Sequence, residues 1–280
     1  MNADSPSPLP RLGAAVLLRA LFKHPRRLNG VPTPRTTYTL DRIDPRQLRR
    51  YRQVLGFRGE GIPLTYYYLL AQRAHVATML DDAFPFRLPG TVHTENALRA
   101  LAEPRTDVPL VLSTSVNIRP PAENGAVIAE LETVARQQGT DIFTCRSTYL
   151  LVRGQRNPRR ARKDKAELPV LAGWRIPRGM GRAYARISGD WNPIHLWTWS
   201  ARLMGLQRPI IHGMHTLARA CAELEQACGR RILALEGRFR APAPLGSELV
   251  LGADLAAGSF AVGGGGRVVA EGSFRTSDLS

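Results

Sequence analysis

The 280-residue sequence contains little cysteine and little lysine, and it has no long hydrophobic run. Its three cysteines, Cys145, Cys221 and Cys228, are too few and odd in number for a disulfide framework, which indicates a reducing compartment such as the cytoplasm. The most apolar N-terminal stretch, residues 12–22, is interrupted by Arg19 and lacks a small-residue cleavage site. It therefore predicts a short amphipathic helix rather than a signal peptide, and no membrane-spanning segment is expected.

Positive charge is abundant, and arginine supplies nearly all of it. The formal net charge is +16 at pH 7, and only three of the 39 basic residues are lysines. A bias toward arginine often reflects genomic base composition, but the charge itself attracts phosphate-bearing or acidic partners. Apart from a cluster at residues 153–165 the basic residues are scattered, and no nucleic-acid recognition motif accompanies them. The sequence therefore does not predict a nucleic-acid partner.

The order of elements predicts two similar halves. A proline- and arginine-rich extension covers residues 1–34, and a basic linker covers 154–169, between halves at 35–153 and 170–280. In the first half, periodicity and turn residues predict a strand at 36–40, helices at 45–55 and 63–82, and strands at 91–98, 110–118, 126–135 and 142–152. In the second half they predict a strand at 181–187, helices from Pro193 and at 213–228, and strands at 232–239, 248–255, 260–262 and 267–275. This order predicts an α+β fold in which an antiparallel sheet wraps one long helix in each half.

An acid and a histidine lie five residues apart within residues 184–195, Tyr-Ala-Arg-Ile-Ser-Gly-Asp-Trp-Asn-Pro-Ile-His. Asn192 followed by Pro193 predicts a helix start, because asparagine caps the first turn and proline tolerates its first position. His195 then lies in the first turn, where the helix dipole disfavours a protonated imidazole and favours a neutral general base. The glycine before Asp190 permits a tight turn, so the two side chains are expected to converge on one water molecule. Either residue alone also fits a structural role, as a turn residue or a buried histidine.

A second signal follows at Gly213, where the pattern predicts the start of the longest helix of the second half. The first backbone N–H groups of a helix have no internal partner and point outward, so they bind negative charge. A glycine at this position lets a thioester oxygen approach closely as an enolate forms. Gly213 alone also fits an ordinary helix start. Together with Asp190 and His195, it provides the parts needed to add water to an activated acyl group or to remove it.

Residues 184–195 and the later Pro-Ile-Ile-His-Gly-Met at 209–214 resemble the signature of the MaoC-like dehydratases, also called type-2 or R-specific enoyl-CoA hydratases. Every key position of the pattern Tyr…Ser-Gly-Asp-x-Asn-Pro-x-His is present. The first half is similar to double hot-dog members of this family more loosely, through residues 48–57, 84–86 and 92–93. The resemblance implies a double hot-dog fold. Because the first half has no copy of the motif, we expect it to be catalytically inactive, with its helix at 66–80 either lining an acyl-chain tunnel or filling the core.

The resemblance further implies a lyase of fatty acid metabolism that reversibly hydrates trans-2-enoyl thioesters to (R)-3-hydroxyacyl thioesters. Asp190 and His195 would activate the water and supply the α-proton, and the Gly213 N–H group would help form the oxyanion hole. Supporting roles would fall to Tyr184, Ser188 and Asn192. No cofactor or metal ion is implied. The substrate would be an acyl-CoA or an acyl-carrier-protein thioester, since the phosphates of the first and the acidic surface of the second both suit the positive charge. Acyl chain length, pathway, the division of roles within the pair, and a monomeric or homodimeric state stay open.

Three alternatives compete with a hydratase. A zinc site would draw its ligands from Asp190, His195, His212 and His215, which are suitable types, but the motif already accounts for the first two. An acyl-thioesterase of the same fold also needs an acid and an oxyanion site, although its water attacks the carbonyl carbon. A non-catalytic subunit that binds acyl thioesters or a carrier protein has no need of the intact motif. The two glycines within 179–181 lack the rest of a dinucleotide-binding fingerprint and are interpreted as a turn.

Overall fold

The computed structural model describes residues 6–24, 34–155 and 168–277, which fall into two compact units. The first unit comprises residues 1–44 and 67–165, and the second comprises residues 45–66 and 166–280. The boundaries predicted from the sequence differ from these units, because they assign residues 45–66 to the first half and set residues 1–34 apart as an extension. The predicted basic linker consists largely of residues 156–167, which lie outside the described part of the chain.

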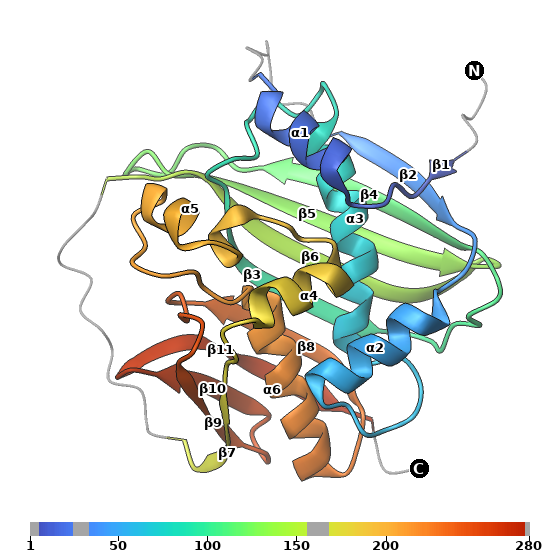
Figure 1. Ribbon diagram of the computed structural model, residues 1–280. Coiled ribbons are helices and arrows are strands. Elements are labelled where there is room, and N and C mark those ends of the chain that lie inside the picture. Colours follow the sequence, from blue (N-terminus) through green and yellow to red (C-terminus); the bar gives the residue numbers. More distant parts are fainter. Residues whose placement is uncertain (1–5, 25–33, 156–167, 278–280) are drawn as a thin grey trace. The chain divides into compact units, whose positions relative to one another are not determined.

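In the first unit a six-stranded sheet packs against one long helix, α3 (Figure 1). The strands run in the order β1-β2-β4-β5-β6-β3, and neighbours are antiparallel except for the parallel pair β1 and β2. The elements are β1 (Ser7–Pro8), α1 (Ala14–Phe22), β2 (Arg35–Leu40), α3 (Tyr67–Leu80), β3 (Val92–Ala100), β4 (Leu110–Ile118), β5 (Val127–Gln137) and β6 (Thr140–Val152). Each strand predicted from the sequence in this half is confirmed, with its ends within two residues of the prediction.

Part of the predicted N-terminal extension belongs to this unit. β1 pairs with β2 at the edge of the sheet, and Leu9 is buried. Arg73 of α3 donates hydrogen bonds to the carbonyl oxygens of Leu9, at 2.7 Å, and Pro10, at 2.8 Å. The predicted amphipathic helix is confirmed as α1. None of the helices in the described ranges is both long enough and apolar enough to cross a membrane.

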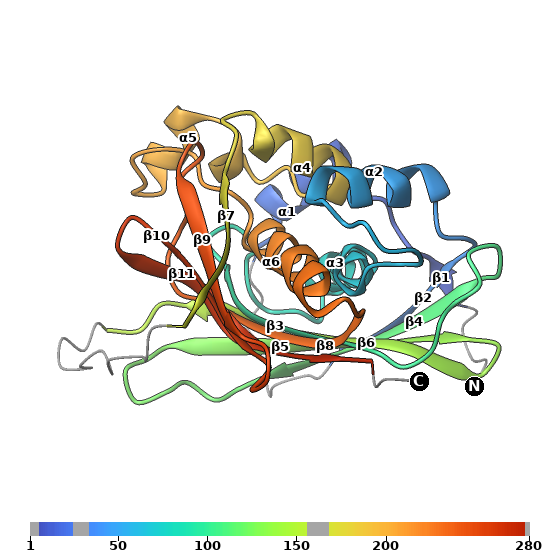
Figure 2. The ribbon, with the colours of Figure 1, turned by 90° about the horizontal axis from the view of Figure 1, so that it is seen from below.

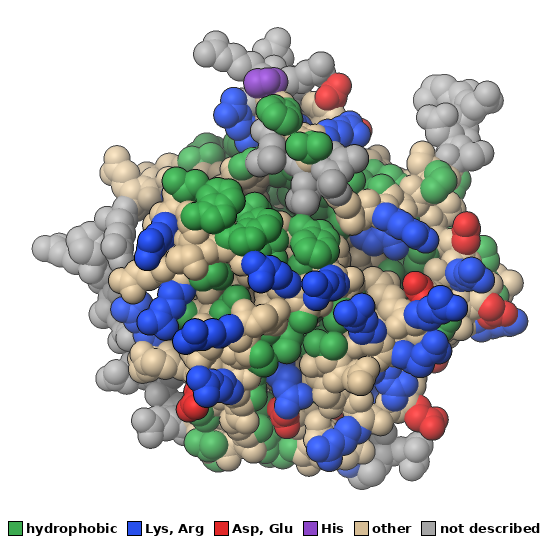
Figure 3. Space-filling model, viewed as in Figure 1, with side chains coloured by type: hydrophobic (Ala, Val, Ile, Leu, Met, Phe, Trp, Pro, Cys, Tyr) green, Lys and Arg blue, Asp and Glu red, His purple; other side chains and the backbone are tan. Residues whose placement is uncertain are grey.

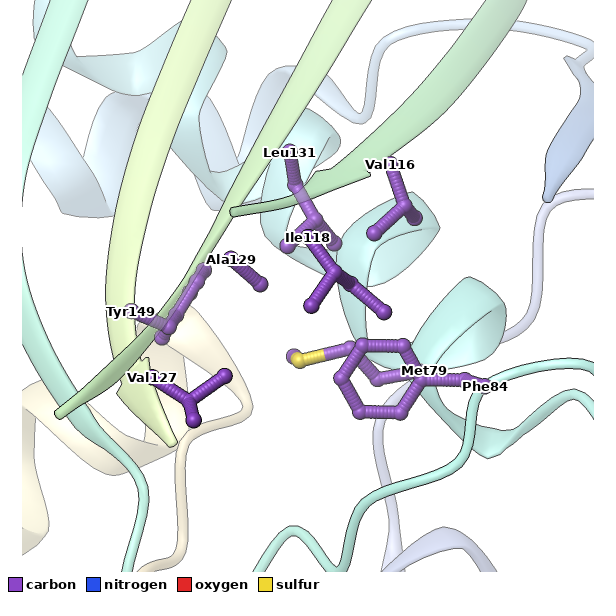
Figure 4. Packing of buried hydrophobic residues seen from close by; sticks show 8 residues of the cluster. All are labelled: Met79, Phe84, Val116, Ile118, Val127, Ala129, Leu131 and Tyr149. Carbon is purple, nitrogen blue, oxygen red and sulfur yellow. The ribbon is translucent and has the colours of Figure 1, made fainter. Parts of the chain in front are cut away.

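The core of the first unit explains why α3 has no polar face. Eleven of its fourteen residues are buried, as expected of a helix enclosed by other elements. Strands β4 and β5 alternate buried and less buried residues along most of their length, so one face of the sheet packs inward. Met79 of α3 and the following Phe84 pack with side chains of β4, β5 and β6 (Figure 4). Truncating a fully buried ring such as that of Phe84 costs about 3–5 kcal/mol, so this cluster anchors the unit.

The second unit repeats the arrangement with a five-stranded antiparallel sheet and the long helix α6. Its strands run in the order β8-β11-β10-β9-β7. The elements are α2 (Pro45–Leu55), η1 (Leu64–Tyr66), β7 (Val170–Arg175), α4 (Met180–Ser188), η2 (Pro193–His195), α5 (Thr198–Leu203), α6 (Gly213–Cys228), β8 (Ile232–Phe239), β9 (Glu248–Asp254), β10 (Ser259–Gly264) and β11 (Arg267–Thr276). Helix α2 contacts both α4 and α6, and Figure 2 shows α2 and α4 side by side. These contacts are the reason that residues 45–66 group with the second unit.

The strand predicted at residues 181–187 is wrong, because this segment is helix α4. Its buried residues include Gly181, Tyr184, Ala185 and Ser188, which recur at helical spacing. The alternation of large residues with alanine at 182–186 imitates the two-residue period of a strand. The first strand of this half is β7 instead, so each half begins with a strand, continues with helices and ends with four strands.

Candidate active site

The loop that carries Asp190 is fixed to the end of α4. Gly189 ends the helix in the left-handed region, at φ 77°, where a side chain would be strained. The Ser188 hydroxyl donates to the carbonyl oxygen of Tyr184, at 3.0 Å, and accepts the backbone N–H of Asp190, at 3.2 Å. Ser188 therefore holds the backbone of the acid in place. The Asp190 carboxylate itself accepts the backbone N–H of Asn192, at 3.1 Å, so it also serves as a turn residue.

The predicted helix start at Asn192 is confirmed, but the helix is shorter than expected. The Asn192 side chain accepts the backbone N–H of Ile194, at 3.3 Å, and Pro193 opens a 3₁₀ turn of only three residues. So short a turn has little dipole, and the reason given from the sequence for a neutral His195 is therefore wrong. Burial, rather than the helix dipole, keeps the His195 ring neutral.

His195 is held in one tautomer. Its Nδ1 atom lies 2.8 Å from the carbonyl oxygen of Ile210, which can only accept, so Nδ1 carries the proton and Nε2 keeps a lone pair. Burial lowers the pKa of His195, and the Asp190 carboxylate and the hydrogen bond to Ile210 offset part of this shift. A neutral imidazole with Nε2 free of hydrogen is suited to accept a proton.

His212 connects Asp190 and His195. Its ring stacks on that of His195, with the ring centroids 3.6 Å apart, and its Nε2 atom donates to the backbone carbonyl oxygen of Asp190, at 2.9 Å. Burial and the neighbouring His195 together lower the pKa of His212 to about 3, so His212 is neutral near pH 7. The sequence places His212 within the motif at 209–214 but predicts a role for it only as a metal ligand. Its position directly before Gly213 is the one signal that links it to the motif.

The side chains of Asp190, His195 and His212 converge. Each offers one carboxylate oxygen or ring nitrogen, and these atoms lie within 4.8 Å of one another. Zinc accepts carboxylate oxygen and imidazole nitrogen as ligands. Of the four residues of the alternative zinc site, the structure therefore brings together Asp190, His195 and His212 but not His215. One ring nitrogen of each histidine is already bonded to a backbone carbonyl, which leaves Nε2 of His195 and Nδ1 of His212.

Tyr184 forms the inner wall of the site. Its ring lies 5.0 Å from that of His212 and 5.4 Å from that of His215. Burial raises the pKa of Tyr184, and the Asp190 carboxylate raises it further, so the hydroxyl stays protonated. Neither this hydroxyl nor Nδ1 of His212 has a hydrogen-bond partner among the described residues. Buried polar atoms of this kind are usually satisfied by water or a ligand.

Gly213 is the first residue of α6, as predicted, and the structure adds a packing reason for glycine there. A β-carbon at this position would lie 2.9 Å from ring atoms of Phe239 in β8, well inside ordinary contact. The ring of Phe239 therefore requires a residue without a side chain at the start of α6. The first N–H groups of this sixteen-residue helix have no partners within it.

Gly181 positions His195, a role that the sequence does not predict, because the two glycines within 179–181 indicate only a turn. It lies in the first turn of α4, and a β-carbon there would overlap the carbonyl oxygen of His195. Only glycine lets the 3₁₀ turn pack this closely on the helix. No local pattern reveals this contact, since the two residues are fourteen positions apart.

Comparison with known proteins places these residues in a family. A family model described as MaoC like domain matches residues 155–257. The 3-hydroxyacyl-thioester dehydratase X of Mycobacterium tuberculosis is 32% identical over 207 residues, which are 69% of this chain and 71% of that protein. This chain belongs to the MaoC-like dehydratase family.

Solved structures of MaoC-like dehydratases share the fold. The crystal structure of HtdX from Mycobacterium tuberculosis matches with a TM-score of 0.70 and 25% identity, covering 86% of this chain and 100% of that one. A MaoC-like dehydratase from Phytophthora capsici matches with a TM-score of 0.66 and 18% identity, covering 88% and 96%. The double hot-dog fold predicted from the sequence is therefore confirmed.

The predicted site residues of this MaoC-like chain all lie in the second unit. Four of them, Tyr184, Ser188, Asp190 and Asn192, belong to α4 and the loop after it, and the others are His195 and Gly213. The structure brings Asp190 and His195 together, and it adds His212, Gly181 and the carbonyl oxygen of Ile210. Each addition is a contact between segments distant in sequence.

Proposed function

We propose that this MaoC-like protein reversibly hydrates trans-2-enoyl thioesters to (R)-3-hydroxyacyl thioesters, and that in the reverse direction it is a 3-hydroxyacyl-thioester dehydratase. The observation that carries the proposal is the convergence of Asp190 with a His195 whose Nδ1 is bound to a backbone carbonyl. The relative from Mycobacterium tuberculosis is named a 3-hydroxyacyl-thioester dehydratase, which supports the reaction class. The (R) configuration of the product rests on the resemblance of the motif to that of R-specific hydratases.

In the proposed reaction a water molecule lies between the Asp190 carboxylate and Nε2 of His195. The neutral ring takes a proton from the water at Nε2 while the water oxygen bonds to the β-carbon. The electrons of the Cα=Cβ bond move toward the thioester oxygen and give an enolate, whose carbonyl re-forms when the Asp190–His195 pair delivers a proton to the α-carbon. The pair gains one proton and loses one, so it ends the cycle as it began. Asp190 also stabilises the imidazolium formed between these steps.

The negative charge on the thioester oxygen needs a donor, and the Gly213 N–H group is the proposed one. It stands at the N-terminus of α6, where the His212 side chain makes no capping hydrogen bond to the helix. One donor of this kind stabilises a transition state by about 3 kcal/mol. In this scheme Ser188 holds the backbone of Asp190, Asn192 holds the turn, and the buried Tyr184 hydroxyl stays protonated.

The test is hydration of crotonyl-CoA, followed by chiral analysis of the product. We expect (R)-3-hydroxybutyryl-CoA from the unmodified protein, and a loss of about 10²–10⁴-fold in kcat in Asp190→Asn and in His195→Gln. Asp41→Asn is the matched control, because it makes the same chemical change on an exposed carboxylate of the first unit. Full turnover by folded Asp190→Asn and His195→Gln variants would refute the assignment.

The same assay separates the alternatives. A thioesterase would release free thiol from an acyl-CoA, and a non-catalytic binding subunit would turn over no enoyl thioester of any chain length.

A cytoplasmic location stays a prediction from the cysteines, all three of which are free thiols. The choice of a monomer or a homodimer is open to size-exclusion chromatography with light scattering.

A further inference from the structure

Helices α2 and α4 form a continuous surface beside the proposed active site. They contact each other, and Gln47 of α2 donates a hydrogen bond to the carbonyl oxygen of Ile187 in α4, at 2.7 Å (Figures 1 and 2). Ile187 lies three residues before Asp190. Both helices belong to the second unit. Because α4 leads directly into the loop that carries Asp190, this surface adjoins that loop.

Most of the exposed residues of this surface are arginines. We call it the arginine face and define it by five exposed residues, Arg46, Arg49, Arg50, Arg182 and Arg186. Neither α2 nor α4 contains an acidic residue. Figure 3 shows basic side chains gathered over these two helices. The last four of the five make no ion pair with any described residue, so their charge is available to a partner.

The size of the arginine face argues against a single small anion. At 1.5 Å per residue the eleven residues of α2 span roughly 16 Å, and packed helices lie about 8–10 Å apart. The charges are therefore spread over a surface, whereas a phosphate group needs donors that converge on one point. A pocket of about 220 Å³ at the end of α2 does contain Arg52, Arg58 and Arg219, but Arg52 and Arg219 already bond to backbone carbonyls.

The arginine face is also unlike a membrane-binding surface. Interfacial helices combine basic residues with large apolar side chains that enter the lipid. The exposed large hydrophobic residues of the described chain include none from α2 or α4. In the second unit three of the most exposed are Trp199 and Leu203 on α5 and Val170 on β7. An extended surface that carries basic residues and no acidic ones fits an acidic protein surface best.

We propose that the arginine face docks the acidic surface of an acyl carrier protein, which delivers the thioester to the site beside Asp190. The inference rests on the proposed hydratase function and names the carrier of its substrate. Single exposed ion pairs contribute little, so the docking depends on several arginines acting together and weakens as salt is added. Its main effects are faster encounter and a lower KM, because the charges steer the partner without touching the reacting atoms.

The experiment compares two substrates across three double variants. Arg49→Glu/Arg50→Glu and Arg182→Glu/Arg186→Glu reverse the arginine face on either helix. Arg267→Glu/Arg275→Glu makes the same change in net charge at two exposed residues of β11 and is the control. The substrates are trans-2-enoyl thioesters of several chain lengths, attached to CoA or to a purified bacterial acyl carrier protein.

We expect each arginine-face variant to raise the KM for carrier-linked substrate about tenfold, with kcat and all CoA kinetics unchanged. The control variant is expected to keep wild-type values for both substrates. Unchanged KM in both arginine-face variants, or an equal rise for CoA and carrier-linked substrates, overturns the proposal.

A binding measurement keeps this result separate from the hydratase proposal. Fluorescence anisotropy of labelled acyl carrier protein reports docking whether or not the chemistry occurs. If no thioester is hydrated but the carrier binds and the arginine-face variants abolish binding, the docking stands and the proposed function fails. Wild-type protein that binds vesicles of phosphatidylcholine and phosphatidylserine but not the carrier protein overturns the docking in favour of a membrane surface.

Discussion

Replacing Gly181 with alanine is predicted to disable turnover while the fold survives. The added β-carbon would lie 3.1 Å from the carbonyl carbon of His195, overlap the carbonyl oxygen, and approach Leu245 to 3.3 Å. The 3₁₀ turn that carries His195 must therefore retreat from α4. A misplacement of about 1 Å at a reacting group lowers the rate by about 10²-fold, so we expect a loss of that order in kcat.

The predicted effect on stability is much smaller. Overpacking costs about 1–3 kcal/mol, and alanine regains up to about 1 kcal/mol over glycine inside a helix. The free energy of unfolding is therefore expected to fall by about 1 kcal/mol, which leaves a folded protein. A large kinetic defect with a small shift in Tm is the signature of a positioning residue.

The assay is steady-state hydration of crotonyl-CoA together with thermal unfolding by circular dichroism. Gly179→Ala is a close control, because this glycine lies two residues earlier and a β-carbon there meets nothing within 4 Å. We expect Gly179→Ala to keep the wild-type kcat. If Gly181→Ala also keeps it, the contact between α4 and the turn does not position His195 and the reasoning is wrong.

The remaining predictions concern the histidines and metal. His212→Phe keeps a ring stacked on His195 but loses the hydrogen bond to the Asp190 carbonyl, so kcat is expected to fall about tenfold at similar KM; wild-type kinetics would remove His212 from the site. Burial lowers the pKa of His195 below its ordinary 6.5, so the neutral base predominates above the lowered value and is lost as pH falls through it; an acid limb of the kcat profile above 6.5 would contradict this. Burial also lowers the pKa values of His75, His212 and His215 to about 3, so the unfolded chain binds more protons and stability declines as pH falls from 6.5 toward 3; a Tm independent of pH in that window would be inconsistent. Dialysis against EDTA is expected to leave turnover unchanged, whereas activity restored by zinc would favour a metal site at Asp190, His195 and His212.

Long elements were predictable from the sequence because their periodicity is extended. The helix at 213–228 and the strand at 232–239 occupy the residues expected of them. Short buried segments carry too few periods to distinguish a strand from a helix, which is why α4 was predicted as a strand. The membership of α2 in the second unit had no local signal at all, since it depends on contacts with α4 and α6.

The candidate site also has features that the sequence predicts and features that depend on contacts between distant residues. Asp190, His195 and Gly213 stand in local patterns of caps and turns, so their residue types and spacing identified them. The tautomer of His195 depends on a carbonyl fifteen residues away, and the link from His212 to Asp190 spans twenty-two residues. Such contacts arise only when the chain folds, and they convert a recognisable motif into a site with a defined proton acceptor.

The short segment before α6 fixes the spacing between His195 and the Gly213 N–H group. The carbonyl of Ile210 holds the ring of His195, and Gly213 begins α6 only three residues later. Ile211 donates its N–H to the carbonyl oxygen of Ala243, at 2.8 Å, and Ile210 pairs with Pro244, so the segment is tied to the loop after β8. The proton acceptor and the proposed oxyanion donor are thus spaced by one short piece of backbone. Because every 2-enoyl thioester has the same separation between its β-carbon and its carbonyl oxygen, this spacing is independent of the acyl tail, and chain-length preference must be decided elsewhere in the molecule.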